Sequence, residues 1–526
     1  MKIKHSIIKT AKLLAINIFI IFFLPKMSFG QAPNIQWQKS FGGTLIDRAY
    51  SIQPTTDGGF IIAGGSTSND GDVSANHGGY DLWIVKINSG GNLQWQKSFG
   101  GSGLESIQSI KQTSDGGFIL AATSISNDGD VSGNHGNFDF WIVKLDLNGN
   151  LQWQKSLGGT GNDQATCIET TSDGGYIVAG FSTSNNGDVS GNHGSQDFWI
   201  VKLSSSGNVQ WQKSLGGSGQ EGARCIKQTL DGGFIVAGYS YSNNGDVTGN
   251  HGSDDGWVVK LNNTGILQWQ KTLGGSNSDD CLSIEQTSDG GFVLGGSSKS
   301  NNGDVSGNHG GEDFWVVKLN NIGNLLWQKS LGGSGDDIAL RMRQTSDSGF
   351  ILAGYSNSSD GDVTGNNGGG DYWVVKVNST GILQWQKTLG GSGIDEAWCI
   401  QQTSDGGFIL AGSSNSSDGD VTGNHGGNDF WVVKLNSPTT QVEESNLLNF
   451  VTVYPNPVSD NLTVLLDNFV ENTKMSIHSI EGKLVYSNNN INTTKLTINT
   501  DDWSKGVYTI KIYNNEINKS NRFIRE

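Results

Sequence analysis

Short hydrophobic runs separated by glycine-rich turns recur along most of the chain. In one copy, an alternating run at 223–229 and apolar runs at 234–240, 257–261 and 266–271 each have the length of a strand. Between the first two runs stands Asp-Gly-Gly, and glycine supplies the positive φ that tight hairpin turns need. The repeated region shows no helical periodicity. The pattern therefore predicts four antiparallel strands in each copy.

The copies follow one another at a fixed interval of 58 residues. Two series of tryptophans keep this interval without insertion or deletion: Trp37, Trp95, Trp153, Trp211, Trp269, Trp327 and Trp385, and Trp83, Trp141, Trp199, Trp257, Trp315, Trp373 and Trp431. Seven four-stranded copies predict an all-β fold, a seven-bladed β-propeller, because radial closure leaves only short, protected sheet edges. The alternative is an open solenoid, but the chain shows no capping repeats at the ends of the array.

The repeated region, 31–436, begins and ends at different points of the repeat. It begins with a run of the fourth type at 35–39 and ends with a run of the third type at 431–435. The number of strands balances only if the first run completes the last sheet. We therefore expect the N-terminal strand to close the ring beside 431–435.

Composition and charge limit the class of partner. The 526-residue chain has a formal net charge of −16, and nucleic-acid binding depends on clustered Lys and Arg, so we expect no such partner. Hydrophobic residues make up only 34% of the chain, but each tryptophan can bury ~150–250 Å², which allows a core to form. The balance suits a soluble exported protein, or one that meets cations.

Residues 1–30 are typical of a secretory signal peptide. Lysines precede an apolar stretch at 13–24, and Ser28 and Gly30 stand at −3 and −1 of the expected cleavage before Gln31. The apolar stretch is shorter than the ~20 residues that span a bilayer. An uncleaved membrane anchor is the alternative. After removal of the signal, we expect no transmembrane segment.

The four cysteines follow the repeat rather than a disulfide framework. Cys167, Cys225 and Cys399 share one repeat position, and Cys281 lies two residues before it. A bridge between Cys167 and Cys225 would need Cα atoms within ~7 Å, which is possible only near the axis. We expect buried free thiols.

The loop between the second and third strands is rich in oxygen-bearing side chains. In four copies it has Asp at positions 1, 3 and 12 and Ser or Thr at position 5, the spacing of an EF-hand calcium loop. These residues are Asp70, Asp72, Ser74 and Asp81; Asp128, Asp130, Ser132 and Asp139; Asp360, Asp362, Thr364 and Asp371; and Asp418, Asp420, Thr422 and Asp429. Calcium is one hypothesis, and a structural loop held by Asx-turns is the other. No other cofactor is indicated.

Two further polar series recur in the repeat. A carboxylate precedes the first strand of each copy, where it either lines a mouth of the channel or caps a turn: Asp47, Glu105, Asp163, Glu221, Asp279, Asp337 and Asp395. Six loops carry a histidine, at His77, His135, His193, His251, His309 and His425, and the sixth copy has Asn367 instead. We interpret these histidines as turn residues.

A specific site is best sought where the copies differ. Arg341 stands at a position that the other copies fill with Ser or Cys. Trp398 and Arg224 share another variable position. These three residues are candidates for ligand binding, and drift among tolerant repeats is the alternative.

After Trp431 the repeat stops. A polar linker at 437–447 precedes alternating runs in 448–526, which predict a small Ig-like β-sandwich. This segment contains the motif residues Tyr454, Pro455, Asn456, Pro457, Gly482, Gly506 and Tyr508.

On these residues the segment resembles the type A C-terminal sorting domain of the type IX secretion system of Bacteroidetes. The resemblance implies Sec export, contact with the type IX machinery, and delivery to the outer-membrane surface or the extracellular space. Whether the domain is then removed, and the protein attached to lipopolysaccharide, stays open. The final residue, Glu526, departs from the family pattern, in which a basic residue is more usual. The array itself is similar to prokaryotic surface propeller repeats.

Near-identical chemistry in every copy favours a non-enzymatic binding or adhesion propeller. We expect a monomer that contacts a surface glycan or protein ligand through several equivalent sites. A glycan lyase or hydrolase would need a unique pair of carboxylates or a unique base at one channel mouth, whereas nearly every acid has six equivalents. A calcium-stabilised spacer is the third possibility, and the sequence names no ligand.

Overall fold

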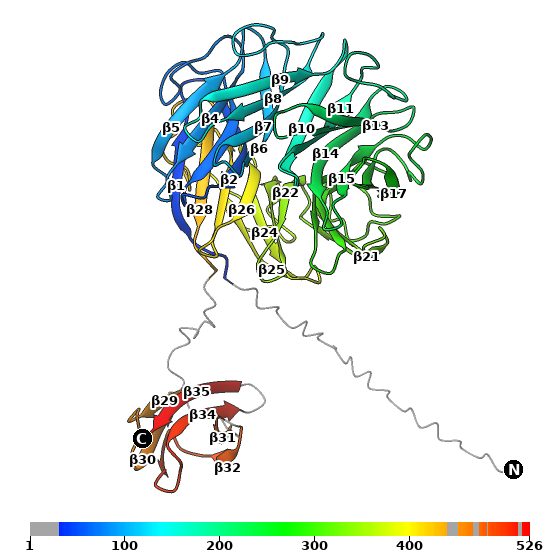
Figure 1. Ribbon diagram of the computed structural model, residues 1–526. Coiled ribbons are helices and arrows are strands. Elements are labelled where there is room, and N and C mark those ends of the chain that lie inside the picture. The colour runs from blue at the N-terminus through cyan, green and yellow to red at the C-terminus, as the bar shows by residue number, and fades with distance from the viewer. Residues whose placement is uncertain (1–30, 439–450, 467–472, 481, 514–517) are drawn as a thin grey trace, which may run out of the picture. The chain divides into compact units, whose positions relative to one another are not determined.

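The computed structural model describes residues 31–438, 451–466, 473–480, 482–513 and 518–526 (Figure 1). The chain divides into two compact units, Met1–Thr439 and Thr440–Glu526, which are described separately. The expected signal peptide and residues 439–447 of the expected linker lie outside the described residues.

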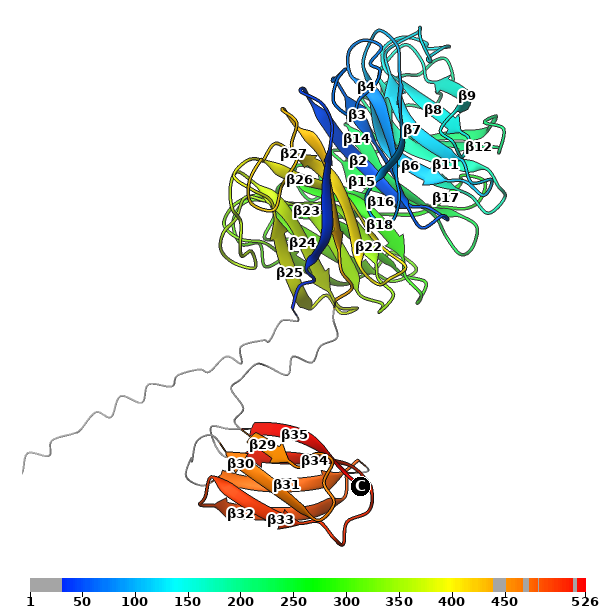
Figure 2. The ribbon, with the colours of Figure 1, turned by 90° about the vertical axis from the view of Figure 1, so that its left-hand side faces the viewer.

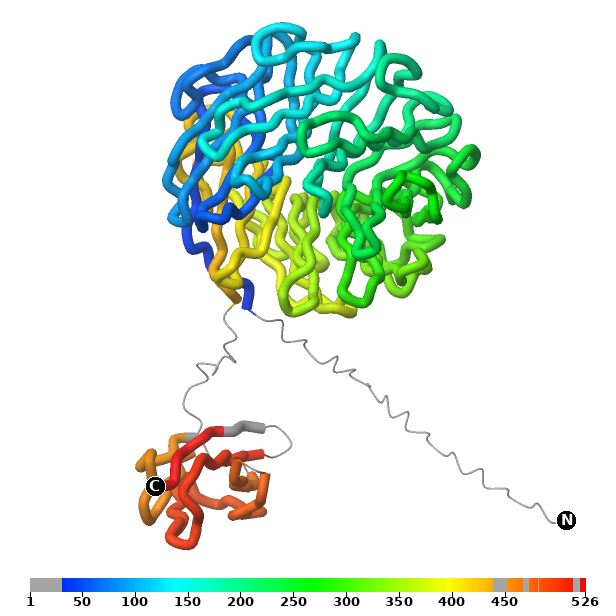
Figure 3. Tube along the Cα trace, in the orientation of Figure 1, coloured from blue at the N-terminus to red at the C-terminus, as the bar shows by residue number. Residues whose placement is uncertain are grey.

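The first unit is a ring of seven antiparallel sheets with four strands each (Figures 1 and 3). The strands nearest the axis are β2 (Asp47–Pro54), β6 (Glu105–Gln112), β10 (Asp163–Thr170), β14 (Glu221–Gln228), β18 (Asp279–Gln286), β22 (Asp337–Gln344) and β26 (Asp395–Gln402). The second strands are β3 (Phe60–Ser66), β7 (Phe118–Ser124), β11 (Tyr176–Ser182), β15 (Phe234–Ser240), β19 (Phe292–Ser298), β23 (Phe350–Ser356) and β27 (Phe408–Ser414).

Two outer strands complete each sheet. The third strands are β4 (Asp81–Ile87), β8 (Asp139–Leu145), β12 (Asp197–Leu203), β16 (Asp255–Leu261), β20 (Asp313–Leu319), β24 (Asp371–Val377) and β28 (Asp429–Leu435). The outermost strands are β5 (Leu93–Phe99), β9 (Leu151–Leu157), β13 (Val209–Leu215), β17 (Leu267–Leu273), β21 (Leu325–Leu331), β25 (Leu383–Leu389) and β1 (Ile35–Phe41). The unit is the predicted seven-bladed β-propeller.

The N-terminal strand completes the last sheet. β1 pairs antiparallel with β28, with Trp37 opposite Lys434, and Figure 2 shows β1 in dark blue beside the yellow strands. The last sheet also packs against the first as its neighbours pack together. Cys399 Sγ lies 3.7 Å from the carbonyl oxygen of Ile52, just as Cys167 Sγ lies 3.8 Å from that of Ile226. The expected clasp is therefore present.

The two middle strands of every sheet carry the core. Every residue of β4 is buried, and the same holds for the other third strands, because neighbouring sheets cover both faces. This explains why their sequences do not alternate: apart from the first Asp and one buried Lys, every residue of β4 is apolar. The outermost strands are partly exposed, and exposed and buried residues do not alternate along them.

The two tryptophan series hold neighbouring sheets together. Trp83 is fully buried, its ring centroid lies 4.5 Å from that of Phe430 in the preceding sheet, and its Nε1 donates a hydrogen bond to Gln96. Across the same interface, Trp37 packs against Phe60 with a centroid separation of 6.2 Å. Equivalent contacts recur around the ring. The 58-residue interval thus marks a repeated packing unit between sheets.

One interface departs from this pattern and compensates for it. Gly256 stands where most copies have Phe or Tyr, and Cys281 of the next sheet stands where most have Ala. A Cβ added at Gly256 would lie 2.5 Å from Cys281 Sγ, so the larger cysteine occupies the space left by the missing ring. Packing against Gly256 therefore explains why Cys281 lies two residues before the position that the other three cysteines share.

The second unit consists of two antiparallel sheets that share one core. The three-stranded sheet has the order β29 (Val451–Tyr454), β30 (Asn461–Leu466), β33 (Lys495–Asn499). The four-stranded sheet has the order β32 (Leu484–Ile491), β31 (Thr473–Ser479), β34 (Gly506–Tyr513), β35 (Asn518–Arg525). Buried side chains from both sheets, such as Leu462 and Ile510, meet in one cluster, as in a small sandwich. None of the described residues forms a helix long and apolar enough to cross a membrane.

Candidate binding pocket on the ring axis

The innermost strands present side chains to the ring axis in layers. Each of these strands has a register shift, which in β2 falls between Ala49 and Ser51. Such a bulge adds a residue to one strand and re-aims the side chains beside it. As a result, residues on both sides of the bulge line the axis, while buried residues such as Ile52 face the neighbouring sheets.

The layer formed by the first halves of the innermost strands, called here the upper layer, surrounds a cavity of about 570 Å³. Its charged lining residues are Arg224, Arg341, Asp280, Glu312 and Glu396. Its aromatic lining residues are Tyr50, Phe138, Phe181, Tyr355 and Trp398. The structure therefore brings together Arg224, Arg341 and Trp398, the three residues at which the sequence analysis noted departures from the repeat.

This cavity is asymmetric although the ring is built from near-copies. The position of Arg224 is filled in the other copies by Tyr50, Gln108, Thr166, Leu282, Leu340 and Trp398, all of which line the cavity. Leu282, Ile338 and Leu340 form an apolar part of the wall, and the last two lie close to Arg341 in sequence. A single asymmetric ligand can therefore be bound in one orientation, which seven identical sites would not allow.

Several polar groups of the cavity wall are buried and form no hydrogen bond with any described residue. They are Nε of Arg224, Nε of Arg341, Nε1 of Trp398 and Oδ1 of Asp280. A buried donor or acceptor without a partner costs about 1–3 kcal/mol. Such groups on the wall of a cavity are therefore candidates for ligand contacts.

Two of these residues are held in place by aromatic neighbours. The guanidinium of Arg224 lies 5.1 Å from the centroid of the Tyr239 ring, a cation–π geometry. The Trp398 ring meets that of Tyr50 edge to face, with centroids 5.1 Å apart. Their orientation is thus fixed before any ligand arrives.

Asp280 is an unusual acid within this wall. Burial raises the pKa of Asp280 to about 6, and the nearby Arg224 offsets only part of that effect. Asp254 and Glu312 raise the pKa further by repulsion. Asp280 can therefore act as a donor or an acceptor near neutral pH.

A ring of charged side chains closes the axis below the cavity. Lys111 and Lys227 contact Glu169 at 2.9 and 2.7 Å, and Arg343 contacts Glu285 at 3.0 Å. Burial would raise the pKa of Glu169, but the two lysines outweigh it and hold that pKa at about 2. Between this ring and the upper layer remains a void of about 10 Å³, room for about one water. The cavity is therefore closed from below.

The four cysteines are buried and unpaired, as predicted. Cys167, Cys225 and Cys399 line the small void together with Arg341. A hydrogen bond from the thiol of Cys167 lowers the pKa of Cys225, and Lys227 and Arg341 act in the same direction.

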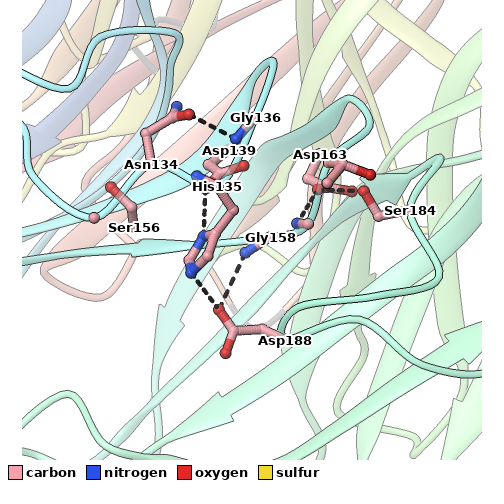
Figure 4. A network of polar contacts seen from close by, with 12 residues as sticks. Asn134, His135, Gly136, Asp139, Ser156, Gly158, Asp163, Ser184 and Asp188 are labelled. Atoms are coloured by element: carbon pink, nitrogen blue, oxygen red, sulfur yellow. Dashed lines mark hydrogen bonds and ion pairs between the residues drawn. The ribbon is translucent and has the colours of Figure 1, made fainter.

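The carboxylates that precede the inner strands do not line the channel mouth. Asp163 is fully buried and accepts hydrogen bonds from Gly159 N at 2.7 Å and Ser184 Oγ at 2.9 Å (Figure 4). Its six equivalents are buried as well: Asp47, Glu105, Glu221, Asp279, Asp337 and Asp395. The interpretation of these acids as a negatively charged funnel is therefore wrong, and they are turn caps.

The glycine pairs follow from this arrangement. A Cβ added at Gly158 would lie 2.5 Å from Asp139 and 2.7 Å from Asp163, so the turn has room only for glycine. Asp139, at the start of the third strand β8, and Asp163, at the start of the innermost strand β10, thus enclose the turn from both sides.

The loop histidines hold the carboxylate at the start of the third strand, which is Asp139 in the second copy. His135 Nδ1 lies 2.7 Å from Asp139 Oδ2, and the backbone N of His135 donates to the same oxygen (Figure 4). In the sixth copy Asn367 supplies only its backbone N to Asp371. Burial accordingly raises the pKa of Asp371 to about 6. The histidines thus act in the turn, as interpreted from the sequence.

The EF-hand spacing does not bring its oxygens together. Asp128 accepts from Ser102 N at 2.8 Å and Ser132 from Gln154 at 2.5 Å, while Asp139 faces His135. Within the described part of the chain, no three His, Cys, Asp or Glu side chains are grouped to hold a metal ion. Calcium at these loops remains a prediction without geometric support.

The motif residues of the second unit are placed around its core. Gly482 adopts a φ of 83°, which glycine accepts readily. Tyr508 is buried, stacks on Phe523 with centroids 5.7 Å apart, and donates its hydroxyl hydrogen to the carbonyl of Ser504.

Comparison with known families bears directly on this unit. Residues 452–526 match the family described as secretion system C-terminal sorting domain. The unit is thus a type IX secretion sorting domain, which interacts with the type IX machinery, and the protein is exported to the cell surface or the extracellular space.

The propeller has more distant relatives. The chain is 24% identical over 428 residues to the regulatory protein FlaEY of Caulobacter vibrioides, an alignment that covers 71% of this chain and 44% of that protein. The chain therefore spans less than half the length of that relative. Similar solved structures include Sqt1 of Chaetomium thermophilum, with 10% identity, a TM-score of 0.40 and coverage of 77% and 100%. Another is BBS1N in complex with ARL6DN, with 11% identity, a TM-score of 0.43 and coverage of 78% and 98%.

Proposed function

We propose that this exported propeller is a binding protein that takes one polar ligand, the end of a surface saccharide, in the axial cavity. The observation that carries the proposal is the group of unpartnered polar side chains in an asymmetric cavity. A volume of about 570 Å³ lies within the ~300–1,000 Å³ usual for small-molecule sites.

The repeated polar groups do not offer a comparable site. The loop aspartates and histidines, and the carboxylates of the turns, bond to one another or to backbone, and the unpartnered Oδ1 of Asp139 and its equivalents is buried inside the turn against glycine. This argues against multivalent contact through seven equivalent sites and in favour of one ligand end per ring. The repeats build the frame, and the axis supplies the recognition.

The composition of the wall suits a sugar. The C–H face of a sugar ring packs on aromatic rings, which Trp398 and Tyr50 supply. Its hydroxyls need both donors and acceptors, which Asp280, Gln108 and Gln164 supply.

A glycan-active enzyme is the second candidate, and Asp280 favours it. A carboxylic acid with a pKa of about 6 beside further carboxylates can serve as a general acid. Glu312, however, is held by Lys299 at 3.3 Å and by Ser297. Binding without turnover is the function we propose.

The test is a glycan screen with the mature chain, residues 31–526, followed by mass spectrometry of the bound sugar. We expect saccharide binding that falls at least ~10-fold in Trp398→Ala, because the aromatic platform and its donor are lost. The control variant is Leu230→Ala, whose side chain is 84% exposed in a turn away from the cavity lining. No saccharide binding would refute the proposal. Cleaved sugar, lost in Asp280→Asn, would establish the enzyme instead.

A further inference from the structure

The cationic side chains near the axis fall into two groups that differ in their partners. Lys111, Lys227 and Arg343, below the cavity, each contact a carboxylate within 3.0 Å. Arg224 and Arg341, on the cavity wall, make no ion pair with any described residue. Arg341 and Arg343 stand two residues apart on the same strand, β22, so the difference in their partners arises within a single strand.

Arg341 is the less compensated of the two unpaired arginines. Arg224 rests on the Tyr239 ring, whereas Arg341 makes no hydrogen bond, ion pair or ring contact within the described residues. Arg341 lines both the cavity and the small void beneath it, so it lies at the cavity floor. A guanidinium at a cavity floor with no carboxylate within ion-pair distance can receive an anionic group of a ligand.

The chemistry of the wall narrows the choice of anion. Asp280, Glu312 and Glu396 line the same cavity, and together they would repel a dianion such as a phosphate group. A single carboxylate meets less repulsion and matches the planar fork of a guanidinium, which can donate two parallel hydrogen bonds. The carboxylates of the wall can then accept from sugar hydroxyls.

We infer that the saccharide bound in the axial cavity is an acidic sugar, a uronic-acid type of residue whose carboxylate is held by Arg341 at the cavity floor. Trp398 supplies a ring face and an Nε1 donor, and Asp280 and Glu396 face the hydroxyls. This inference rests on the proposed function and names its ligand class.

The experiment is a calorimetric titration of the mature chain with a matched pair of oligosaccharides. Galacturonic acid oligomers and galactose oligomers of equal length differ mainly in the carboxylate. We expect the acidic oligomer to bind about 10- to 100-fold more tightly, the range for a charge-assisted bidentate contact. Arg341→Gln should abolish this preference, so that the acidic and the neutral oligomer bind with similar affinity.

Three controls make the outcome decisive. Lys213→Gln removes one positive charge from an exposed position of β13, and should leave the preference intact. Circular dichroism and the melting temperature show whether Arg341→Gln has folded, and Arg341→Lys retains the charge without the fork.

The failures of the two proposals can be told apart. Equal affinity for the two oligomers, or an unchanged preference in Arg341→Gln, overturns the acidic-sugar inference but leaves saccharide binding in place. Tighter binding of a sulfated galactose oligomer than of the galacturonic one overturns the choice of carboxylate. Absence of binding to any saccharide overturns both proposals.

Discussion

The interfaces between sheets and the lining of the axis use the same repeat in opposite ways. Between sheets, one position holds tryptophan in all seven copies, and each of these tryptophans is fully buried. On the axis, the position of Tyr50 changes its residue type around the ring. The packing between neighbouring sheets repeats around the ring, so the same residue type fills this position in every copy. The axis, where seven strands meet a shared space, allows each copy its own side chain.

The comparison shows where recognition can reside in a symmetric fold. Repeated charged groups are held inside the turns: Asp163 accepts from Gly159 N, and His135 contacts Asp139. Groups that break the repeat, such as Arg341 and Asp280, are left without partners on a cavity wall. Buried oxygens without a hydrogen-bond partner also occur at repeated positions, such as Oδ1 of Asp139, but these lie inside the turns, whereas Arg341 and Asp280 line the cavity.

The largest expected effect is the difference in the free energy of unfolding between variants of the interface tryptophans and a variant of Trp398 on the axis. Trp199→Ala should lower the free energy of unfolding by about 3–5 kcal/mol, because a fully buried indole leaves a cavity. Trp257→Ala, in the next sheet, should cost a similar amount. Trp398→Ala should cost less than about 1 kcal/mol, since its ring lines a cavity that already exists. Denaturant unfolding followed by fluorescence measures all three. An equal loss in Trp398→Ala would contradict the division.

A smaller loss is expected from the turn carboxylates. Asp163→Ala removes the acceptor of Gly159 N, Ser182 and Ser184 and leaves these buried donors unpaired, so we expect a loss of about 2–3 kcal/mol. Asp188→Ala is the control, because Asp188 is partly exposed, accepts a hydrogen bond from Gly158 N at 3.2 Å and lies 3.9 Å from His135 Nε2. Thermal melting compares them. If both variants melt alike, the carboxylate is not the turn's main support.

The sixth copy offers a test of the histidine–aspartate pair. The folded-state pKa of Asp371, about 6, lies above its unfolded value of ~3.9, so the ring binds more protons than the unfolded chain between these values. The stability contributed by protonated Asp371 is present below pH ~4 and is lost as the pH rises through about 6.

Asn367→His should therefore stabilise the ring by about 1 kcal/mol at pH 7, since it gives Asp371 the partner its equivalents have. The gain should narrow towards pH 4. His309→Asn, the reciprocal change, should lose a similar amount. Melting temperatures across pH 4–8 report both, and a pH-independent difference would exclude the pair as its cause.

The smallest expected effect concerns calcium. The loop oxygens already accept hydrogen bonds from protein donors, so we expect a chelator to shift the melting temperature by less than ~1 °C. A shift of several degrees, restored by added calcium, would support the EF-hand-like hypothesis instead.

Strand positions were predictable from the sequence because each sheet repeats one pattern of apolar runs. The third run, expected at 257–261, forms Asp255–Leu261, and the clasp at 35–39 forms Ile35–Phe41. The differences lie at strand ends, where polar residues such as Asp255 join the ladder although the apolar pattern has stopped.

The candidate site was predictable only in part. Arg341, Trp398 and Arg224 stood out because they break the repeat, but Asp280 and Glu396 break it too and passed unnoticed among the many acids. The turn carboxylates such as Asp163 were expected as either channel lining or caps. Their burial depends on how the loop of one sheet covers the turn of the next.

The repeat in the sequence determined the number of sheets, the strands in each and the closing pair, because these follow from local periodicity and from counting. Only the tertiary structure decided which side chains of the innermost strands share the axis. The bulge in each strand and the convergence of all seven set those distances, and neither is written in any single copy. Residues from distant copies, such as Tyr50 and Trp398, become neighbours only when the ring is closed.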